Sequence, residues 1–152
     1  MEGRAECTEC GFVHYENPKP TASALVVDEH GRLMLSRRAI EPAAGRWDLP
    51  GGFVEADEHP LETLHRELRE EAGIGLRDTE FLGMFLDTYQ AGPRQVTTLN
   101  LYWRARIADG MPEPADDVAE LRFFTPDEIP WDELAFEHLP AVLSAWRGDE
   151  NP

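Results

Sequence analysis

The sequence predicts a single α/β domain, because its 152 residues suit one hydrophobic core and carry both helical and strand-like patterns. Apolar residues recur at helical spacing, three and four residues apart, over 60–72. Runs rich in β-branched and aromatic residues, bounded by turn residues, occur both before and after that helix. The sequence shows no internal repeat, no low-complexity tract and no second domain.

The predicted elements are mostly strands, with one helix in the middle of the chain and another near its end. They are, in order, a strand over 21–27, a turn at 29–31, its hairpin partner over 32–37, a loop over 41–46, a short strand at 53–54, the helix from Pro60, strands over 80–88 and 96–107 joined by a long loop over 89–95 that borders a pocket, a strand over 121–125, a helical turn at 126–129 and a last helix near Pro140. The last helix is expected to bury Val142, Leu143 and Trp146.

The helix over 60–72 has recognisable ends. Pro60 suits the first helical position, and Glu62 adds negative charge to the first turn. Gly73 is expected to end the helix. The apolar stripe that should face the core consists of Leu61, Leu64, Leu68 and Ala72.

Three carboxylates, those of Glu67, Glu70 and Glu71, fall on an arc beside this apolar stripe. Unit charges about 4 Å apart repel by roughly 4 kcal/mol at an effective dielectric near 20, so close convergence of these groups requires a cation. Hard oxygen ligands in this number suit Mg²⁺ or Mn²⁺. An acidic helix face is most often only solvated surface, and this alternative stands beside the metal site. We expect each of these carboxylates to be ionised near neutral pH.

Residues 52–74 resemble a known family motif, the Nudix box G-x5-E-x7-R-E-U-x-E-E-x-G-U, in which U is a bulky aliphatic residue. Every fixed position of the box is matched, and Leu68 and Ile74 fill the two U positions. The flanking sequences, WDLPGG from Trp47 and SRRA from Ser36, are also similar to those of the family.

The resemblance implies a Nudix-type α/β/α sandwich with a mixed β-sheet, which hydrolyses a nucleoside diphosphate linked to another moiety. It also implies roles for the box residues in metal binding and catalysis. Divalent metal would be held by Glu67, Glu70, Glu71 and the backbone carbonyl of Gly51, while Arg66 would orient these carboxylates and Glu58 would support the site from outside.

A general base in such a site is usually a carboxylate, from the box or from a later loop. Within the box we favour Glu67 as ligand or base. Outside the box, Asp117 precedes the strand over 121–125, where Nudix proteins often place a further acidic metal ligand, and Glu120 is the alternative.

Four residues outside the box are candidates for substrate binding. Arg37 and Arg38 could contact phosphates, although charged side chains at a strand end are as often only solvent-facing. Trp47 precedes the glycine pair of the box, and Tyr89 could stack on a base or a ribose. A tyrosine at a strand end is more often a packing residue, so Tyr89 has a structural alternative.

The first 19 residues are expected to form a short arm ahead of a Nudix hydrolase domain over 20–148. Cys7 and Cys10 are the two cysteines of the sequence, and one C-x2-C pair supplies half of the four ligands of a structural zinc site. The stretch CTECGFVHYENPKP resembles the latter half of the zinc ribbon of NADH pyrophosphatase-like proteins, so Zn²⁺ could bind here, shared between two chains or with His14 as a third ligand. The alternative is an arm with two ordinary thiols.

The overall charge limits the partners of the protein. With 30 acidic and 14 basic residues, the formal net charge is −16, which disfavours nucleic acid and anionic membranes. No stretch approaches the roughly 20 apolar residues of a transmembrane helix, and MEGRAECTEC lacks the apolar run of a signal peptide. We therefore expect a cytoplasmic protein that binds a small nucleotide. The resemblance also makes a homodimer an open alternative.

The resemblance leaves the substrate open, because the box binds metal and diphosphate and says little about the groups at either end. ADP-ribose or a related nucleotide sugar is our first choice. NADH is disfavoured because the S-Q-P-W-P-F-P-x-S array of NADH pyrophosphatases does not follow Ile74. Dinucleoside polyphosphates and damaged nucleoside triphosphates remain alternatives, as does a Nudix protein that binds nucleotides without hydrolysis.

Overall fold

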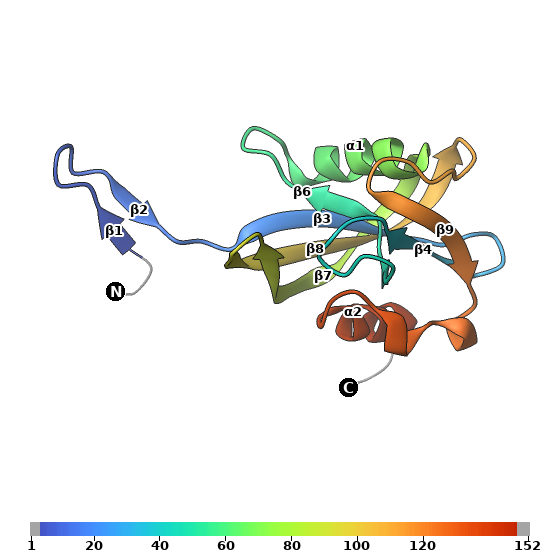
Figure 1. Ribbon diagram of the computed structural model, residues 1–152. Helices are drawn as coiled ribbons and strands as arrows, with labels where there is room; N and C mark the ends of the chain where they lie inside the picture. The colour runs from blue at the N-terminus through green and yellow to red at the C-terminus, as the bar shows by residue number, and fades with distance from the viewer. Residues whose placement is uncertain (1–3, 149–152) are drawn as a thin grey trace.

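The computed structural model describes residues 4–148 of the chain (Figure 1). Its strands are β1 (Arg4–Glu6), β2 (Val13–Tyr15), β3 (Lys19–Val26), β4 (Leu33–Arg38), β5 (Trp47–Asp48), β6 (Gly51–Phe53), β7 (Gly75–Ala91), β8 (Arg94–Asp109) and β9 (Val118–Phe124). Its helices are α1 (Pro60–Ala72) and α2 (Leu139–Arg147), with 3₁₀ turns at Pro126–Glu128 and Trp131–Glu133. None of the described helices combines the length and hydropathy that crossing a membrane requires.

The body of the protein is an α/β/α sandwich. One sheet has the strand order β6-β3-β8-β7, and a second has the order β5-β4-β9. The first sheet is mixed, since β3 runs parallel to β8 but antiparallel to β6. The two helices lie on opposite sides of the sheets (Figure 1). The fold class predicted from the sequence is therefore confirmed.

Two clusters of buried side chains hold the layers together. Leu64, Leu68 and Ala72 of α1 pack on one side, in a cluster that includes strand residues of the first sheet. Leu139, Val142 and Leu143 of α2 pack on the other side, against strand residues that include Leu25, Leu35 and Tyr102. Both helices thus contribute apolar stripes to a core, as their periodicity predicted.

The ends of α1 form where the sequence places them. Pro60 is the first helical residue, and Gly73 caps the helix with its backbone N–H directed to the carbonyls of Arg69 and Leu68. At the start, the Glu62 carboxylate accepts a hydrogen bond from the backbone N–H of His59, and His59 Nδ1 accepts one from Leu61 N–H. This reciprocal capping fixes the orientation of the helix that carries the box carboxylates.

The predicted hairpin between 21–27 and 32–37 is wrong. β3 and β4 belong to different sheets and are joined by a single bridge between Val27 and Leu33. The turn around Asp28 carries the chain from one sheet to the other. Four consecutive residues of β4, from Leu33 to Ser36, are buried, so this strand does not alternate between core and solvent as a surface hairpin would.

The predicted long loop over 89–95 is also wrong. Strand β7 continues to Ala91 and β8 begins at Arg94, so only Gly92 and Pro93 connect them. Tyr89 pairs with Val96 inside the ladder, and cross-strand pairing continues to the last residue of β7. Tyr89 therefore lies on a strand, with its position fixed by backbone hydrogen bonds.

The amino-terminal arm forms a small sheet of its own, in which β1 pairs with β2. Figure 1 shows this hairpin projecting from the sandwich. The predicted arm includes residues 1–3, which lie outside the described residues. The boundary of the arm at residue 19 stays a prediction. In the structure, Lys19 is the first residue of β3.

Candidate active site

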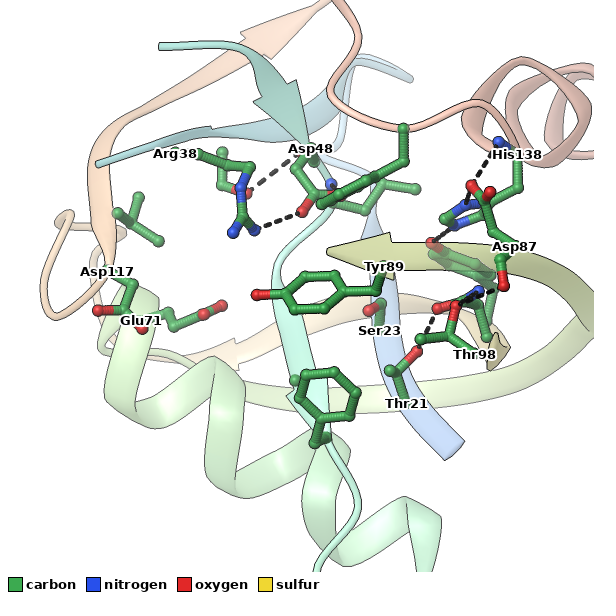
Figure 2. A pocket seen from close by; sticks show the side chains of 18 of the residues that line it. Thr21, Ser23, Arg38, Asp48, Glu71, Asp87, Tyr89, Thr98, Asp117 and His138 are labelled. Carbon is green, nitrogen blue, oxygen red and sulfur yellow. Dashed lines mark hydrogen bonds and ion pairs between the residues drawn. The ribbon is translucent and has the colours of Figure 1, made fainter. Parts of the chain in front are cut away.

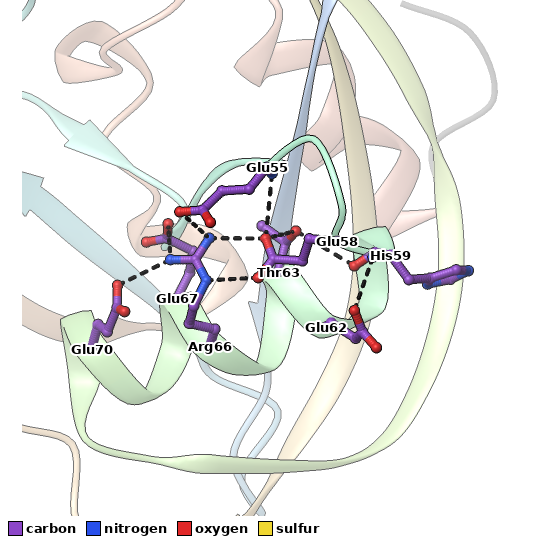
Figure 3. A network of polar contacts seen from close by, with 8 residues as sticks. All are labelled: Glu55, Glu58, His59, Glu62, Thr63, Arg66, Glu67 and Glu70. Atoms are coloured by element: carbon purple, nitrogen blue, oxygen red, sulfur yellow. Dashed lines mark hydrogen bonds and ion pairs between the residues drawn. The ribbon is translucent and has the colours of Figure 1, made fainter.

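Arg66 is the centre of a network of ion pairs on α1 (Figure 3). Its Nε and Nη2 donate to the two carboxylate oxygens of Glu58 at 2.8 and 3.0 Å. Its Nη1 donates to Glu67 at 3.0 Å and to Glu70 at 3.2 Å. Hydrogen bonds from Arg66 and then Thr63 lower the pKa of Glu58 to about 2. Arg66 therefore holds Glu58, Glu67 and Glu70 in fixed orientations, whereas the box resemblance implied that it would orient Glu67, Glu70 and Glu71.

Glu71 lies apart from this network, at the end of α1 that faces the loop between β5 and β6. One of its carboxylate oxygens accepts a hydrogen bond of 2.9 Å from the backbone N–H of Gly51. The pKa of Glu71 is raised to about 8, chiefly by burial and further by the charges of Glu67, Asp48 and Asp117, while this hydrogen bond opposes the rise. The expectation that each box carboxylate is ionised near neutral pH is wrong for Glu71 in the metal-free protein.

The glycine pair allows the loop to approach α1 closely. A Cβ atom on Gly52 would lie 2.4 Å from Glu67 Oε1, and one on Gly51 would lie 2.2 Å from the carbonyl oxygen of Ala22. Gly51 also has a φ of 154°, which side chains disfavour. At this pair the backbone therefore lies too close to Glu67 and to Ala22 for an ordinary side chain.

Asp117 reaches the site because its loop is tied to the end of α1. The backbone N–H of Ala115 donates to the carbonyl of Glu71 at 3.0 Å, and Glu113 N–H donates to that of Ala72 at 3.0 Å. Asp117 and Glu71 consequently line the same cavity. Asp116, which the sequence reasoning did not select, raises the pKa of Glu67 through its charge, after the larger effect of burial.

The chemistry of these residues fits a hard divalent cation. Within residues 4–148, no three acidic, histidine or cysteine side chains already converge as a preformed metal site, because Arg66 holds Glu67 and Glu70 while Glu71 turns to Gly51. The donors present are carboxylate and carbonyl oxygens, which Mg²⁺ and Mn²⁺ prefer. Burial is the main cause of the raised pKa of Glu71, and the charges of Glu67, Asp48 and Asp117 add to it, so a bound cation would favour the ionised carboxylate.

A cavity of about 160 Å³ opens beside Glu71 and runs between the two sheets (Figure 2). Glu71 and Asp117 lie at one end in this view, Asp87 and His138 lie at the other, and the ring of Tyr89 lies between them. The cavity thus joins the end of the Nudix-like box to a second polar region formed by strands and by the start of α2.

The far end of the cavity is a buried chain of hydrogen bonds. Asp87 Oδ2 lies 2.6 Å from His138 Nδ1 and also accepts the backbone N–H of His138 at 3.0 Å. His138 Nε2 lies 2.6 Å from the hydroxyl of Tyr102. Burial would raise the pKa of Asp87, but hydrogen bonds from His138 and Thr88 together lower it. These contacts fix the start of α2 to the sheet.

The side of the cavity carries aromatic rings and one arginine. The ring of Tyr89 lies 5.4 Å from that of Phe53 and 6.0 Å from that of Phe136. The guanidinium of Arg38 lies 5.0 Å from the centre of the Phe136 ring and pairs with Asp48 at 3.3 Å. Burial raises the pKa of Asp48, although Arg38 opposes this effect. Aromatic faces of this kind suit a base or the apolar face of a sugar.

The structure separates the four predicted substrate-binding residues into two pairs. Arg38 and Tyr89 line the cavity. Arg37 instead pairs with Glu120 at 3.1 Å, and Trp47 is buried in the core at 4% exposure, so neither is among the lining residues. A role of these two in substrate binding stays a prediction.

Several residues that line the cavity were not predicted from the sequence as site residues. Asp48, Asp87, Phe136 and His138 come from segments far apart in the chain, and no local motif marks them. Only Asp48 had a neighbouring signal, since it lies beside the glycine pair in the stretch WDLPGG. The cysteines of the arm, Cys7 and Cys10, are both exposed and free, and they are not among the residues that line the cavity.

Comparison with known proteins identifies the family. Residues 17–145 match the family model described as NUDIX domain. An RNA pyrophosphohydrolase from Halorhodospira halophila is 48% identical over 65 residues, which are 43% of this chain and 34% of that protein. An ADP-ribose pyrophosphatase from Methanocaldococcus jannaschii is 29% identical over 122 residues, which are 80% of this chain and 70% of that protein.

A solved structure gives the same result for the fold. The crystal structure of a NUDIX hydrolase from Nitrosomonas europaea superposes with a TM-score of 0.73 and 30% identity, covering 98% of this chain and 82% of that one. The segment that matches the RNA pyrophosphohydrolase covers 34% of that protein. This similarity therefore concerns only one part of a longer protein. Since the NUDIX domain match extends over residues 17–145, the chain belongs to the Nudix family.

Proposed function

We propose that the protein is a metal-dependent pyrophosphohydrolase that cleaves the diphosphate of a nucleoside diphosphate derivative, with ADP-ribose or a related nucleotide sugar as the preferred substrate. One observation carries the proposal: the acidic end at Glu71 and Asp117 and the aromatic wall at Tyr89 and Phe136 belong to one cavity. A diphosphate held at the acidic end would place its end group against the aromatic wall.

The acidic end would bind the diphosphate through metal ions. Mg²⁺ or Mn²⁺ held by Glu67, Glu70, Glu71 and the Gly51 carbonyl would polarise the phosphoryl oxygens and lower the pKa of the attacking water. Arg66 keeps Glu67 and Glu70 oriented toward one side of α1. Asp117, on its tethered loop, supplies a further carboxylate as ligand or base.

The charge of the cavity favours an uncharged end group. Asp48 and Asp87 both line it, and the guanidinium of Arg38 already bonds to Asp48 and to the carbonyl of Pro42. A second phosphate group in this region would meet carboxylates without a free cation nearby in the cavity wall. A ribose or another neutral sugar, whose hydroxyl groups donate hydrogen bonds, fits better.

The relatives support the same class of reaction. The family includes the ADP-ribose pyrophosphatase from Methanocaldococcus jannaschii, which matches 80% of this chain. The RNA pyrophosphohydrolase matches over the shorter stretch of 43%, and the net charge of −16 opposes binding of an RNA chain. We therefore place a small nucleotide ahead of nucleic acid as substrate, in a cytoplasmic setting where nucleotides and reduced thiols occur together.

The test is a substrate panel with Mg²⁺, with Mn²⁺ and with EDTA. The panel compares ADP-ribose, a nucleotide sugar, NADH, a dinucleoside polyphosphate and an oxidised nucleoside triphosphate, with identification of the products. We expect release of a nucleoside monophosphate from ADP-ribose or the nucleotide sugar, and none in EDTA. Preference for NADH, the dinucleoside polyphosphate or the oxidised triphosphate would move the proposal to that alternative. Tight binding without product would indicate a non-hydrolytic nucleotide-binding protein.

A further inference from the structure

The buried polar side chains of the protein gather at the cavity. Within residues 4–148 they are Ser23, Ser36, Thr63, Thr98 and Asn100, and all of them except Thr63 line the cavity. A buried polar group costs free energy unless it is hydrogen-bonded, so such groups are not placed at random in a core. Their concentration along one wall therefore points to a polar ligand.

Three polar side chains form a row across this wall, which we call the polar row. They are Thr21 of β3 and Thr98 and Asn100 of β8. Thr98 and Asn100 face the same side of the sheet because they are two residues apart on a strand, and Thr21 is the partner of Asn100 on the neighbouring strand. Figure 2 shows Thr21 and Thr98 at the end of the cavity that carries Asp87. The polar row thus lies away from the acidic end at Glu71.

The backbone fixes the direction of every hydrogen bond in the polar row. Asn100 Nδ2 lies 3.1 Å from the carbonyl oxygen of Phe85, and only the nitrogen of the amide can donate to that carbonyl. Nδ2 also donates to Thr98 Oγ1 at 2.8 Å, and Thr98 in turn donates to the carbonyl of Asp87 at 3.4 Å. Thr21 Oγ1 donates to Asn100 Oδ1 at 2.8 Å. The donor hydrogens of the polar row are therefore all used within the protein.

What the polar row still offers to a ligand is acceptor lone pairs. Within residues 4–148, Thr21 Oγ1 keeps both of its lone pairs, while Asn100 Oδ1 and Thr98 Oγ1 keep one each. The hydroxyl of Ser23, on the same strand as Thr21, lines the cavity and makes no hydrogen bond in this part of the chain, although the residue is only 7% exposed. A hydroxyl can accept as well as donate. A ligand that fits this wall must therefore donate hydrogen bonds.

We propose that the polar row binds the hydroxyl groups of a sugar ring of the substrate and so determines substrate specificity. This inference rests on the proposed function, in which the diphosphate lies at the acidic end of the same cavity. Sugar hydroxyls donate hydrogen bonds, whereas the oxygens of an ionised phosphate only accept them and would meet the lone pairs of the row. A site built to hydrogen-bond a hydroxyl discriminates against an analogue that lacks it, because its buried polar groups are left unpaired. In a nucleotide sugar, the ring is either the ribose of the nucleoside or the sugar beyond the diphosphate.

The experiment measures the affinity of three uncleavable ligands by calorimetry in saturating Mg²⁺. The reference ligand is ADP-ribose with a methylene group in place of the bridging oxygen of the diphosphate. The second ligand lacks the 2′ and 3′ hydroxyls of the adenosine. The third carries a cyclopentylmethyl group, which has no hydroxyl, in place of the sugar beyond the diphosphate. We expect one of these two to bind about 10- to 100-fold more weakly than the reference, which identifies the ring that lies on the polar row.

Valine substitutions connect this preference to the polar row, because valine has the shape of threonine without its hydroxyl. Thr21→Val and Thr98→Val should each weaken binding of the reference ligand by about tenfold and leave the weaker ligand unaffected, so the preference falls. Thr21→Ser keeps the hydroxyl and should keep the preference. Thr97→Val is the matched control, since Thr97 is an exposed residue of β8 that does not line the cavity. Far-ultraviolet circular dichroism checks that each variant is folded.

Three results would overturn the inference. These are no measurable binding of the reference ligand, equal affinity for all three ligands, and valine variants that are folded and keep the full preference. The proposed function is tested separately, with cleavable ADP-ribose. A preference in binding without turnover of ADP-ribose would reject hydrolysis and retain the sugar site, whereas turnover without a preference would do the reverse.

Discussion

Glu71 and Gly51 are joined by a hydrogen bond of 2.9 Å from the backbone N–H of Gly51 to the carboxylate of Glu71, across 20 residues of sequence. The contact connects the end of α1 to the loop that enters β6. It places a carboxyl group with a pKa of about 8 next to a backbone carbonyl that the box resemblance assigns to metal binding. Binding of a divalent cation at this place would therefore be coupled to ionisation of Glu71.

The stability of the metal-free protein should fall as pH rises, because of Glu71. The pKa is about 8 in the folded protein and about 4.5 in the unfolded chain, so the folded state holds the proton more tightly between these values. The stabilisation is fully present below pH 4.5 and is lost as pH approaches 8. In EDTA, the free energy of unfolding of the wild type should fall by on the order of a few kcal/mol over this pH range, and Glu71→Gln should remove that fall. Urea unfolding at several pH values measures it.

The control for this measurement is Glu80→Gln, which changes an exposed carboxylate of β7. Its pH dependence should match that of the wild type. An unaltered pH dependence in Glu71→Gln would show that Glu71 does not titrate in this range. Glu71→Gln should also lower turnover by about 10²-fold in saturating Mg²⁺, because it removes a strong electrostatic group from a catalytic site.

Arg66→Lys should lower turnover or metal affinity by about 10- to 100-fold. A lysine ammonium cannot donate at once to Glu58, Glu67 and Glu70, as the guanidinium of Arg66 does. Arg69→Lys is the matched control, because Arg69 is on the same helix and pairs only with the exposed Asp109 among the described ion pairs. Mg²⁺ titrations of both variants give the comparison, and equal effects would argue against an orienting role of Arg66.

The two glycines of the box should respond differently to alanine. In Gly51→Ala the Cβ would meet the backbone oxygen of Ala22 at 2.2 Å, and φ is 154°, so we expect a loss of stability of roughly 3 kcal/mol or more. In Gly52→Ala the Cβ meets the carboxylate of Glu67, which can turn away. Because turning away breaks the bond of Glu67 to Arg66, that variant should lose less stability than Gly51→Ala and should lose turnover. Thermal unfolding and steady-state kinetics separate the two effects, and a reversed order would contradict the described packing.

Tyr89→Ala should raise KM about tenfold and leave kcat nearly unchanged. The ring lines the cavity between Phe53 and Phe136, and stacking of a base on an aromatic ring contributes about 1–3 kcal/mol. Tyr89→Phe should retain most of the affinity. Phe81→Ala, which removes an aromatic ring 47% exposed outside the cavity, is the control. Normal KM for Tyr89→Ala with the preferred substrate would place the end group elsewhere.

Asp87→Asn should destabilise the protein by about 1–3 kcal/mol at neutral pH, because His138 loses a charged partner for two hydrogen bonds. Since the pKa of Asp87 is lowered in the folded protein, its stabilisation is present above the ordinary value and is lost as pH falls through the lowered value. The variant should therefore be less sensitive to acid unfolding. Asp78→Asn, at an exposed ion pair with Arg77, is the control.

Neighbouring residues on strands show why much of the site was beyond prediction. Arg38 lines the cavity while Arg37 pairs with Glu120 outside it, and Asp48 lines the cavity while Trp47 enters the core. Successive side chains of a strand point to opposite faces, so a local pattern cannot say which neighbour faces the ligand. That choice depends on which sheet the strand joins, and the sequence misassigned β4 to a hairpin with β3.

The sequence by itself determined the box, the helix that carries it and the oxygen-donor chemistry, because the spacing of residues within one helix fixes their relative positions. The tertiary structure alone decided what lies opposite the box. Asp48, Asp87 and His138 meet in one cavity only through sheet pairing and the docking of α2. It also decided that Glu71 holds its proton near neutrality, since burial and the charges of residues distant in sequence set that pKa.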